Sequence, residues 1–187
     1  MFTVLRNTWA LFFGFGIICL AHGLQGTLIG VRSVLEGFSY LSTGLIIAGY
    51  YVGYLSGSII IPIFLKRVGH IRVFAALASL ASIAILIHSV FLDPYSWFVI
   101  RIFTGLSLSG IYIIMESWLN DKSTNQTRGK LLSIYMIITF IFVGLGQLLL
   151  NISDPAKVDL FILVSVLLSF ALLPILLSNI QQPDTHD

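Results

Sequence analysis

Long hydrophobic runs recur along this chain and are separated by short polar segments. A helix that crosses the hydrocarbon core of a membrane needs about 20 apolar residues. A transmembrane β-barrel would instead show strict alternation over about 10 positions, and these runs are continuous. The predicted fold class is therefore all-α, a single integral membrane domain over residues 1–187 with six transmembrane helices, at residues 9–30, 43–64, 73–92, 97–119, 131–151 and 158–180.

Composition supports a membrane protein and excludes a soluble one. Hydrophobic residues make up 57% of the 187 residues and charged residues 10%, whereas soluble domains are about 25% charged. The mean hydropathy of +0.99 also excludes a disordered chain. The single cysteine, Cys19, argues against a disulfide framework and a thiolate metal cluster, and we expect no metal or cofactor.

The placement of Lys and Arg predicts an orientation. Short connections force consecutive helices to run antiparallel, so the connections alternate between the two sides of the membrane. One side carries Arg6, Lys66, Arg67, Arg72, Lys122, Arg128 and Lys130, and the other carries Arg32 and Lys157. By the positive-inside rule, seven basic residues against two place both termini in the cytoplasm. Topology explains these scattered cations, so no nucleic-acid partner is expected.

Polar residues inside the predicted spans are candidates for function, because charges in a bilayer are costly. Arg101 and Glu116, both on the fourth helix, are the two charges there. Arg101 lies about 6 Å in from the outer end of its predicted span, at 1.5 Å per residue. It could share one layer with three polar residues of neighbouring helices, His22, Gln25 and Gln147.

Each of these residues also has a structural interpretation. Arg101 could snorkel to the outer headgroups rather than line a cavity, and His22 and Gln25 could hydrogen-bond between helices. Tyr50, Tyr51 and Tyr54 are typical packing residues, and His88 is expected to be structural. For Glu116 we expect a salt bridge to one of three basic residues of the cytoplasmic connections, Arg67, Arg72 or Arg128, rather than a proton relay.

Small residues suggest an internal repeat. Gly49, Gly53 and Gly57 recur every four residues on the second helix, a spacing that permits close helix approach. Polar and small residues concentrate on the first, second, fourth and fifth helices, so the third and sixth are expected to face lipid. This pattern favours two three-helix units, as in the inverted repeats of secondary transporters.

Three stretches of the chain are similar to motifs of one known family. The connection from Leu65 to Arg72 is similar to the family pattern G-x-x-x-D-[RK]-x-G-[RK]-[RK] through Arg67, Gly69 and Arg72, although Pro62 and Lys66 replace the first glycine and the aspartate. Arg101-x-x-x-Gly105 resembles the family's motif on the fourth helix. The third stretch, Glu116 to Asp121 continuing through Thr127 to Lys130, resembles an uncharacterised bacterial branch of the same family. Together the three stretches resemble the major facilitator superfamily of transporters.

The resemblance implies an architecture. The whole chain is similar to the N-terminal half of a transporter with 12 helices, in the inner membrane of a bacterium. The first and fourth helices would line the central cavity, and the third and sixth would face outward. The second and fifth would meet a second six-helix half, in the same chain or another, so that the Gly49/Gly53/Gly57 stripe would face that half.

The resemblance also implies secondary active transport of a small solute by alternating access. The substrate-binding candidates are His22, Gln25, Tyr50, Tyr54, Arg101 and Gln147, and the candidates for a cytoplasmic gate are Arg67, Gly69, Arg72, Glu116 and Arg128. A non-transporting scaffold, sensor or accessory subunit is the alternative. An intramembrane serine protease is excluded because the sixth helix has no histidine to activate a serine, and ATP is not the driver because the phosphate-binding Gly-x-x-x-x-Gly-Lys-Ser/Thr loop is absent.

Overall fold

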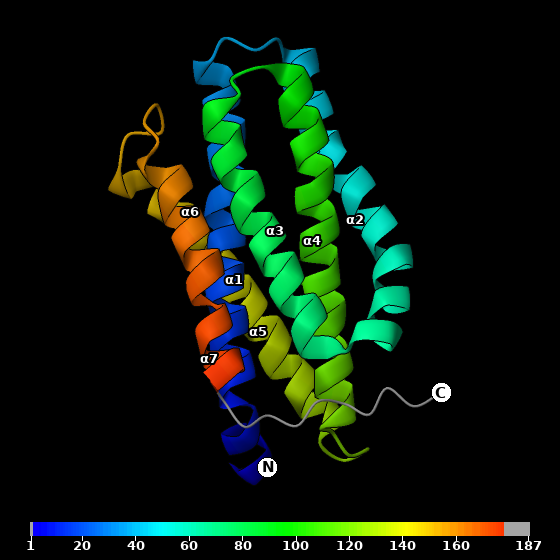
Figure 1. The fold of residues 1–187 in the computed structure, drawn as a ribbon. Helices are drawn as coiled ribbons and strands as arrows, with labels where there is room; N and C mark the ends of the chain where they lie inside the picture. The colour runs from blue at the N-terminus through cyan, green and yellow to red at the C-terminus, as the bar shows by residue number, and fades with distance from the viewer. Residues whose placement is uncertain (1, 178–187) are drawn as a thin grey trace.

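The chain forms a bundle of antiparallel helices in a computed structural model (Figure 1), which describes residues 2–177 of the backbone and 8–177 of the side chains. Six of its helices are long and apolar enough to cross a membrane, so the predicted fold class is confirmed. The elements are α1 (Phe2–Leu35), α2 (Tyr40–Val68), α3 (His70–Val90), α4 (Pro94–Asp121), α5 (Arg128–Leu148), the short 3-10 helix η1 (Leu149–Ile152), α6 (Asp159–Phe170) and α7 (Leu172–Leu177).

Capping residues and glycines set the helix boundaries on the upper side in Figure 1. Asp93 caps α4, where its Oδ1 accepts a 2.9 Å hydrogen bond from the Ser96 amide and Pro94 occupies the first turn, as expected of a helix start. Hydrogen bonds from the Ser96 side chain and backbone lower the pKa of the Asp93 carboxyl. Ser39 caps α2 in the same way, and Gly37, with φ of 74°, ends the turn after α1.

The connection between α2 and α3 is shorter than the sequence predicts. Helical structure continues through the basic residues on both sides, and only Gly69 separates the two helices. Gly69 has φ of 90°, a backbone conformation that residues with a side chain rarely adopt. The predicted polar connection over residues 65–72 is therefore wrong, because no residue there other than Gly69 interrupts a helix.

The last membrane-crossing segment contains a break. One continuous helix is predicted over 158–180, but α6 ends at Phe170 and α7 resumes at Leu172. Pro174 explains the break, since it cannot donate a hydrogen bond to the carbonyl four residues earlier, that of Phe170, and its ring crowds that carbonyl. The predicted end at 178–180 lies outside the described residues.

Glycines bring α2 and α4 into backbone contact. A methyl group added at Gly49 would lie 2.8 Å from the carbonyl oxygen of Phe98, and one added at Gly53 would overlap that of Ile102. Gly105 of α4 lies just as closely against the carbonyl of Tyr50. The prediction that the Gly49/Gly53/Gly57 stripe faces a second half is therefore wrong: the stripe is buried within this bundle, where it lets α2 pack on α4.

A matching contact joins α1 and α5. Methyl groups added at Gly23 and Gly146 would overlap the carbonyl oxygens of Val143 and Leu20, respectively. Helix α6 then packs on α1 as α3 packs on α4. These contacts correspond when the first three helices are exchanged with the last three, as expected of two three-helix repeats.

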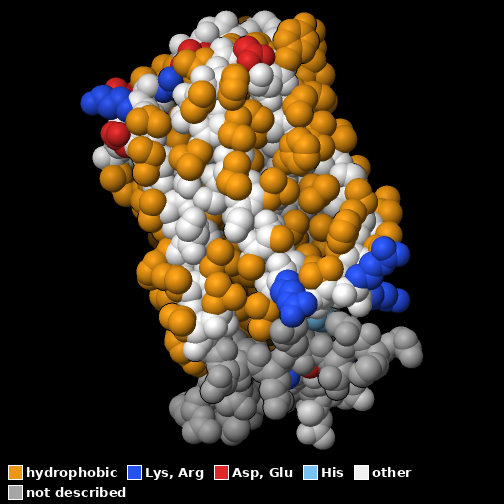
Figure 2. All heavy atoms as spheres, viewed as in Figure 1, with side chains coloured by type: hydrophobic (Ala, Val, Ile, Leu, Met, Phe, Trp, Pro, Cys, Tyr) orange, Lys and Arg blue, Asp and Glu red, His pale blue; other side chains and the backbone are white. Residues whose placement is uncertain are grey.

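The face of the bundle shown in Figure 2 is largely apolar, as expected of a multi-pass membrane protein. In the most hydrophobic stretch of each helix, 17% of the residues of α5 and 33% of those of α2 are buried, against 50% for α3. The third helix was expected to be lipid-facing, but one side of it packs on α4 and α6. Helices α2 and α5 thus have the smallest buried shares of the membrane-crossing segments, and each packs mainly on one other helix of this bundle.

Replacement of Gly53 by Ala tests the close approach of α2 and α4. Because the added methyl would overlap the Ile102 carbonyl, we expect Gly53→Ala to lower the free energy of unfolding by about 1–3 kcal/mol, the usual cost of overpacking. Gly44→Ala is the matched control on the same helix, where nothing lies within 4 Å of the added methyl, and it should be neutral or slightly stabilising. Thermal unfolding in detergent measures both, and equal midpoints would contradict the packing described.

Candidate substrate-binding site

Polar side chains from three helices meet inside the bundle, in a group that we call the His22 cluster: His22 of α1, Tyr50 of α2, and Arg101 and Tyr112 of α4. The His22 ring bridges two phenols, with Nδ1 3.1 Å from the Tyr112 hydroxyl and Nε2 3.3 Å from the Tyr50 hydroxyl. The Arg101 guanidinium lies over the Tyr50 ring, 4.7 Å from its centroid, within the range of a cation–π interaction.

Helix geometry and the glycine contacts assemble this cluster. Arg101 and Tyr112 are eleven residues apart, which is about three turns at 3.6 residues per turn, so both project from one face of α4. Gly105 lies between them and contacts the Tyr50 backbone. The absence of a side chain at this glycine lets α2 approach closely enough for Tyr50 to contact Arg101 and His22 together.

Arg101 is buried without an anionic partner. Its exposed fraction is 6%, and its Nε forms no hydrogen bond within the described residues. Because α4 begins at Pro94, Arg101 lies seven residues, or about 10 Å, along the helix, deeper than the 6 Å expected from sequence. The snorkelling alternative is therefore wrong, since the side chain is buried in the bundle rather than extended to the surface.

The remaining substrate-binding candidates differ in their surroundings. Tyr54 is half-buried, with its ring centroid 6.0 Å from that of Tyr50. Gln25 is buried, and its Nε2 has no hydrogen-bond partner in the described part of the chain. The Gln147 side chain is exposed on α5 and forms no hydrogen bond with the described residues of the cluster. The structure thus brings His22, Tyr50, Tyr54 and Arg101 together but does not link Gln147 to them.

Sequence reasoning missed two members of the site. Tyr112 contacts His22 directly, and the buried Cys19 thiol lies 4.0 Å from the Tyr112 hydroxyl. The three-turn spacing from Arg101 could have indicated Tyr112. No sequence signal marks Cys19, because a single cysteine in an apolar run is a common core residue. The described residues include no group of three or more His, Cys, Asp or Glu that could hold a metal.

At the end of the bundle where α2 meets α3, the gate candidates do not form the expected ion pair. Glu116 accepts a 3.1 Å hydrogen bond from the Tyr135 hydroxyl, and within residues 8–177 the salt bridges are Arg32–Glu36 and Asp121–Lys122. The predicted salt bridge from Glu116 to Arg67, Arg72 or Arg128 is therefore wrong in this structure. All three arginines are exposed, and the Arg128 Nε donates a 3.4 Å hydrogen bond to Ser123.

His88, at the opposite end, has the structural surroundings expected of it. It is fully buried, its Nδ1 lies 2.8 Å from the Ala84 carbonyl oxygen, and its ring packs edge-on against Trp97. The Trp97 Nε1 in turn donates to the carbonyl of Phe91, at 2.6 Å. These contacts close the turn between α3 and α4.

The six-helix bundle with its buried polar cluster is that of a multi-pass membrane protein, and comparison with known proteins identifies the family. The family model described as Major Facilitator Superfamily matches residues 11–185. The chain belongs to this superfamily, which confirms the resemblance seen in the sequence.

The chain is also similar to curated proteins that are named as transporters of this superfamily. The chain is 26% identical, over 189 aligned residues, to the "Uncharacterized MFS-type transporter YcaD" of Escherichia coli O45:K1 (strain S88 / ExPEC) and to its namesake from E. coli O81 (strain ED1a). Each alignment covers 100% of this chain and 50% of the relative. The chain thus spans about half the length of the curated relatives it matches.

Tyr50 variants separate the two interactions of this side chain. Tyr50→Phe keeps the ring under Arg101 and loses the hydrogen bond to His22, whereas Tyr50→Leu loses both. We expect Tyr50→Leu to be the less stable variant by about 0.5–2 kcal/mol, the usual size of a cation–π interaction. Thermal unfolding in detergent measures the difference, with Tyr40→Leu as control because Tyr40 is 96% exposed. Equal stability of the two Tyr50 variants would contradict the Arg101–Tyr50 contact.

Proposed function

We propose that this chain forms the N-terminal six-helix half of a secondary transporter, which moves a small solute across a bacterial inner membrane by alternating access. Membership of the superfamily supports transport, as do relatives named MFS-type transporters. Both termini would be cytoplasmic, because the exposed Lys66, Arg67 and Arg72 lie at the end of the bundle where α1 begins (Figure 1).

The observation that carries the proposal is the unpaired cation of Arg101. A charge buried in a low-dielectric interior is costly unless an opposite charge or hydrogen bonds compensate it. Glu116 lies 15 residues from Arg101 along α4, about 22 Å at 1.5 Å per residue, and the other acidic residues of the described chain lie at helix ends or in the connections. The compensating anion would therefore come from outside this bundle. A substrate with a carboxylate or phosphate group would supply it, since guanidinium binds both in a bidentate geometry.

The His22 cluster would form one wall of the substrate site. Tyr50 and Tyr54 on α2, with His22 on α1, provide hydrogen-bonding groups beside Arg101, a combination of aromatic walls and a few polar groups typical of small-molecule sites. The second six-helix half would supply the opposite wall. It would also cover apolar residues exposed on α2 and α5, such as Leu55 (67% exposed) and Phe140 (68% exposed).

The gate would lie at the end of the bundle where α2 meets α3. Arg67, Arg72 and Arg128 are exposed and form no ion pair within residues 8–177, while Glu116 is exposed and held only by Tyr135. These groups are therefore available to pair with a second half when it closes against this one. Gly69 would let α2 reverse directly into α3 and so hold Arg67 and Arg72 at the same level.

Removal of the Arg101 cation tests the proposal. In the full-length protein we expect Arg101→Ala to abolish transport while membrane insertion stays unchanged, because the site loses its only buried cation within the described residues. Arg101→Lys should retain partial activity, since it keeps the charge but loses the bidentate geometry. The measurement compares small-molecule pools, by mass spectrometry, in cells that express the native protein or a variant.

Lys157→Ala is the matched control, because this exposed cation lies in a connection at the opposite end of the bundle from the proposed gate. A solute pool that changes with the native protein and with Lys157→Ala, but not with Arg101→Ala, would identify the substrate. Solute pools that shift equally with the native protein and with Arg101→Ala would contradict the role proposed for Arg101.

A further inference from the structure

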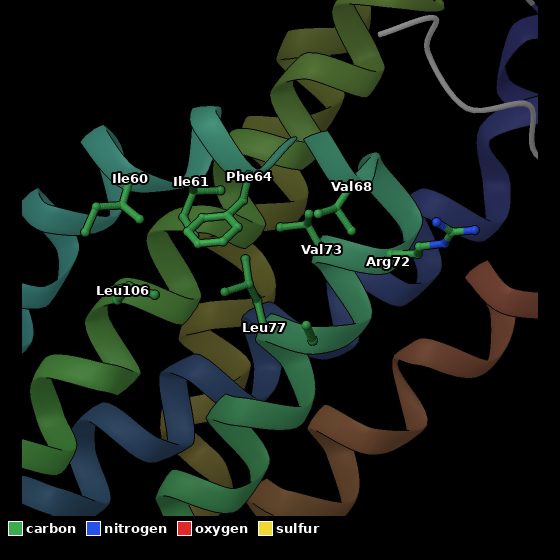
Figure 3. Close-up of a pocket in the computed structure, with 9 residues that line it drawn as sticks. Ile60, Ile61, Phe64, Val68, Arg72, Val73, Leu77 and Leu106 are labelled. Carbon is green, nitrogen blue, oxygen red and sulfur yellow. The ribbon is translucent and has the colours of Figure 1, made fainter. Parts of the chain in front are cut away.

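An apolar groove opens between α2, α3 and α4, away from the His22 cluster. It has a volume of about 280 Å³, roughly twice the ~150 Å³ of an engineered protein cavity that admits benzene. Figure 3 shows it among side chains of the three helices, including Ile60, Phe64, Val68, Val73, Leu77 and Leu106.

The groove arises where the glycine stripe of α2 ends. The four-residue row of Gly49, Gly53 and Gly57 continues along the same face as Ile61 and Leu65. Glycines allow backbone contact with α4, whereas these two bulky side chains hold the helices apart, and α2 diverges from α4 at this end of the bundle (Figure 1). The separation leaves the space unfilled by the protein.

The groove opens onto the outer surface of the bundle. Phe64 of its lining is 52% exposed and Val68 is 41% exposed. A helix surface at this depth is in contact with hydrocarbon rather than water, and a hollow lined by apolar side chains offers water no hydrogen-bond partners. A hydrocarbon chain is therefore the chemical group that fits it.

Cations border one end of this groove. Arg72 is one of its lining residues, and Figure 3 shows the guanidinium at the edge, pointing away from the apolar side chains. Lys66 and Arg67 lie in the last turn of α2, one turn or less from Val68. All three cations are exposed, and none is ion-paired within the described chain.

We propose that this groove binds an anionic phospholipid, with one acyl chain between α2, α3 and α4 and the phosphate at Arg72 and Arg67. Basic residues next to a transmembrane helix end attract anionic headgroups, and Arg72 places such a charge beside the apolar space. The site is separate from the His22 cluster, so it does not depend on the substrate, but it shares Arg67 and Arg72 with the proposed gate.

Native mass spectrometry of the full-length protein in detergent tests this site. The protein is titrated with phosphatidylglycerol or with phosphatidylcholine of the same acyl chains, and retained lipids are counted. We expect preferential retention of phosphatidylglycerol, weakened about fivefold by Arg72→Gln and by Arg67→Gln, the effect of one cation near an anionic lipid. Lys130→Gln is the matched control, an exposed cation at the same end of the bundle but on α5, and should change nothing.

A groove-filling variant distinguishes a lipid from a free anion. Ala76 is an exposed lining residue, so Ala76→Phe should block the acyl chain and reduce phosphatidylglycerol retention without any change in charge. Ala76→Leu serves if the larger variant does not fold. Three outcomes would each overturn the proposal. The two lipids could be retained equally, or inorganic phosphate could compete in a way that Ala76→Phe leaves unaffected. The protein could also retain no lipid, because the second half covers the groove.

Discussion

Backbone contact between helices at glycines is the constraint on which the rest of this structure depends. At Gly53 and Gly105 on one side, and at Gly23 and Gly146 on the other, no side chain fits between the helix and the opposing carbonyl. In a membrane, an apolar side chain gains little by contacting another helix instead of lipid. Close packing of this kind therefore determines which helices pair. The pairs α2 with α4 and α1 with α5 interleave the two three-helix repeats and make one bundle of them.

This pairing also explains the site and the groove. Contact at Gly105 brings Tyr50 across to Arg101 and His22, so one glycine both joins two helices and assembles the polar cluster. The same helix pair separates once Ile61 and Leu65 replace glycine in the four-residue row. The polar site thus forms where the glycines of α2 contact α4, and the apolar groove forms where that row of glycines ends.

The positions of the helices could be predicted from the sequence more accurately than the contacts between them. Runs of about 20 apolar residues were sufficient for six spans, and the depth of Arg101 and His22 was enough to place them in one layer. The direction of the glycine stripe was wrong, because a four-residue spacing identifies a face for close packing but not the partner that meets it. The prediction of a Glu116 ion pair was wrong for a similar reason, because the sequence does not show that Tyr135, 19 residues later and on another helix, donates a hydrogen bond to Glu116.

Under the proposed function, the burial of Arg101 against Tyr50 would give the two halves of the transporter an electrostatic reason to associate. An aromatic face compensates part of the cost of a buried guanidinium, but a cation–π contact contributes about 2 kcal/mol when desolvated, less than the several kcal/mol that an unpaired buried ion costs. The remainder favours any state in which an anion is present near Arg101. Substrate binding and closure of a second half around it would then be coupled through one side chain, because each would exclude the water that otherwise competes for that charge.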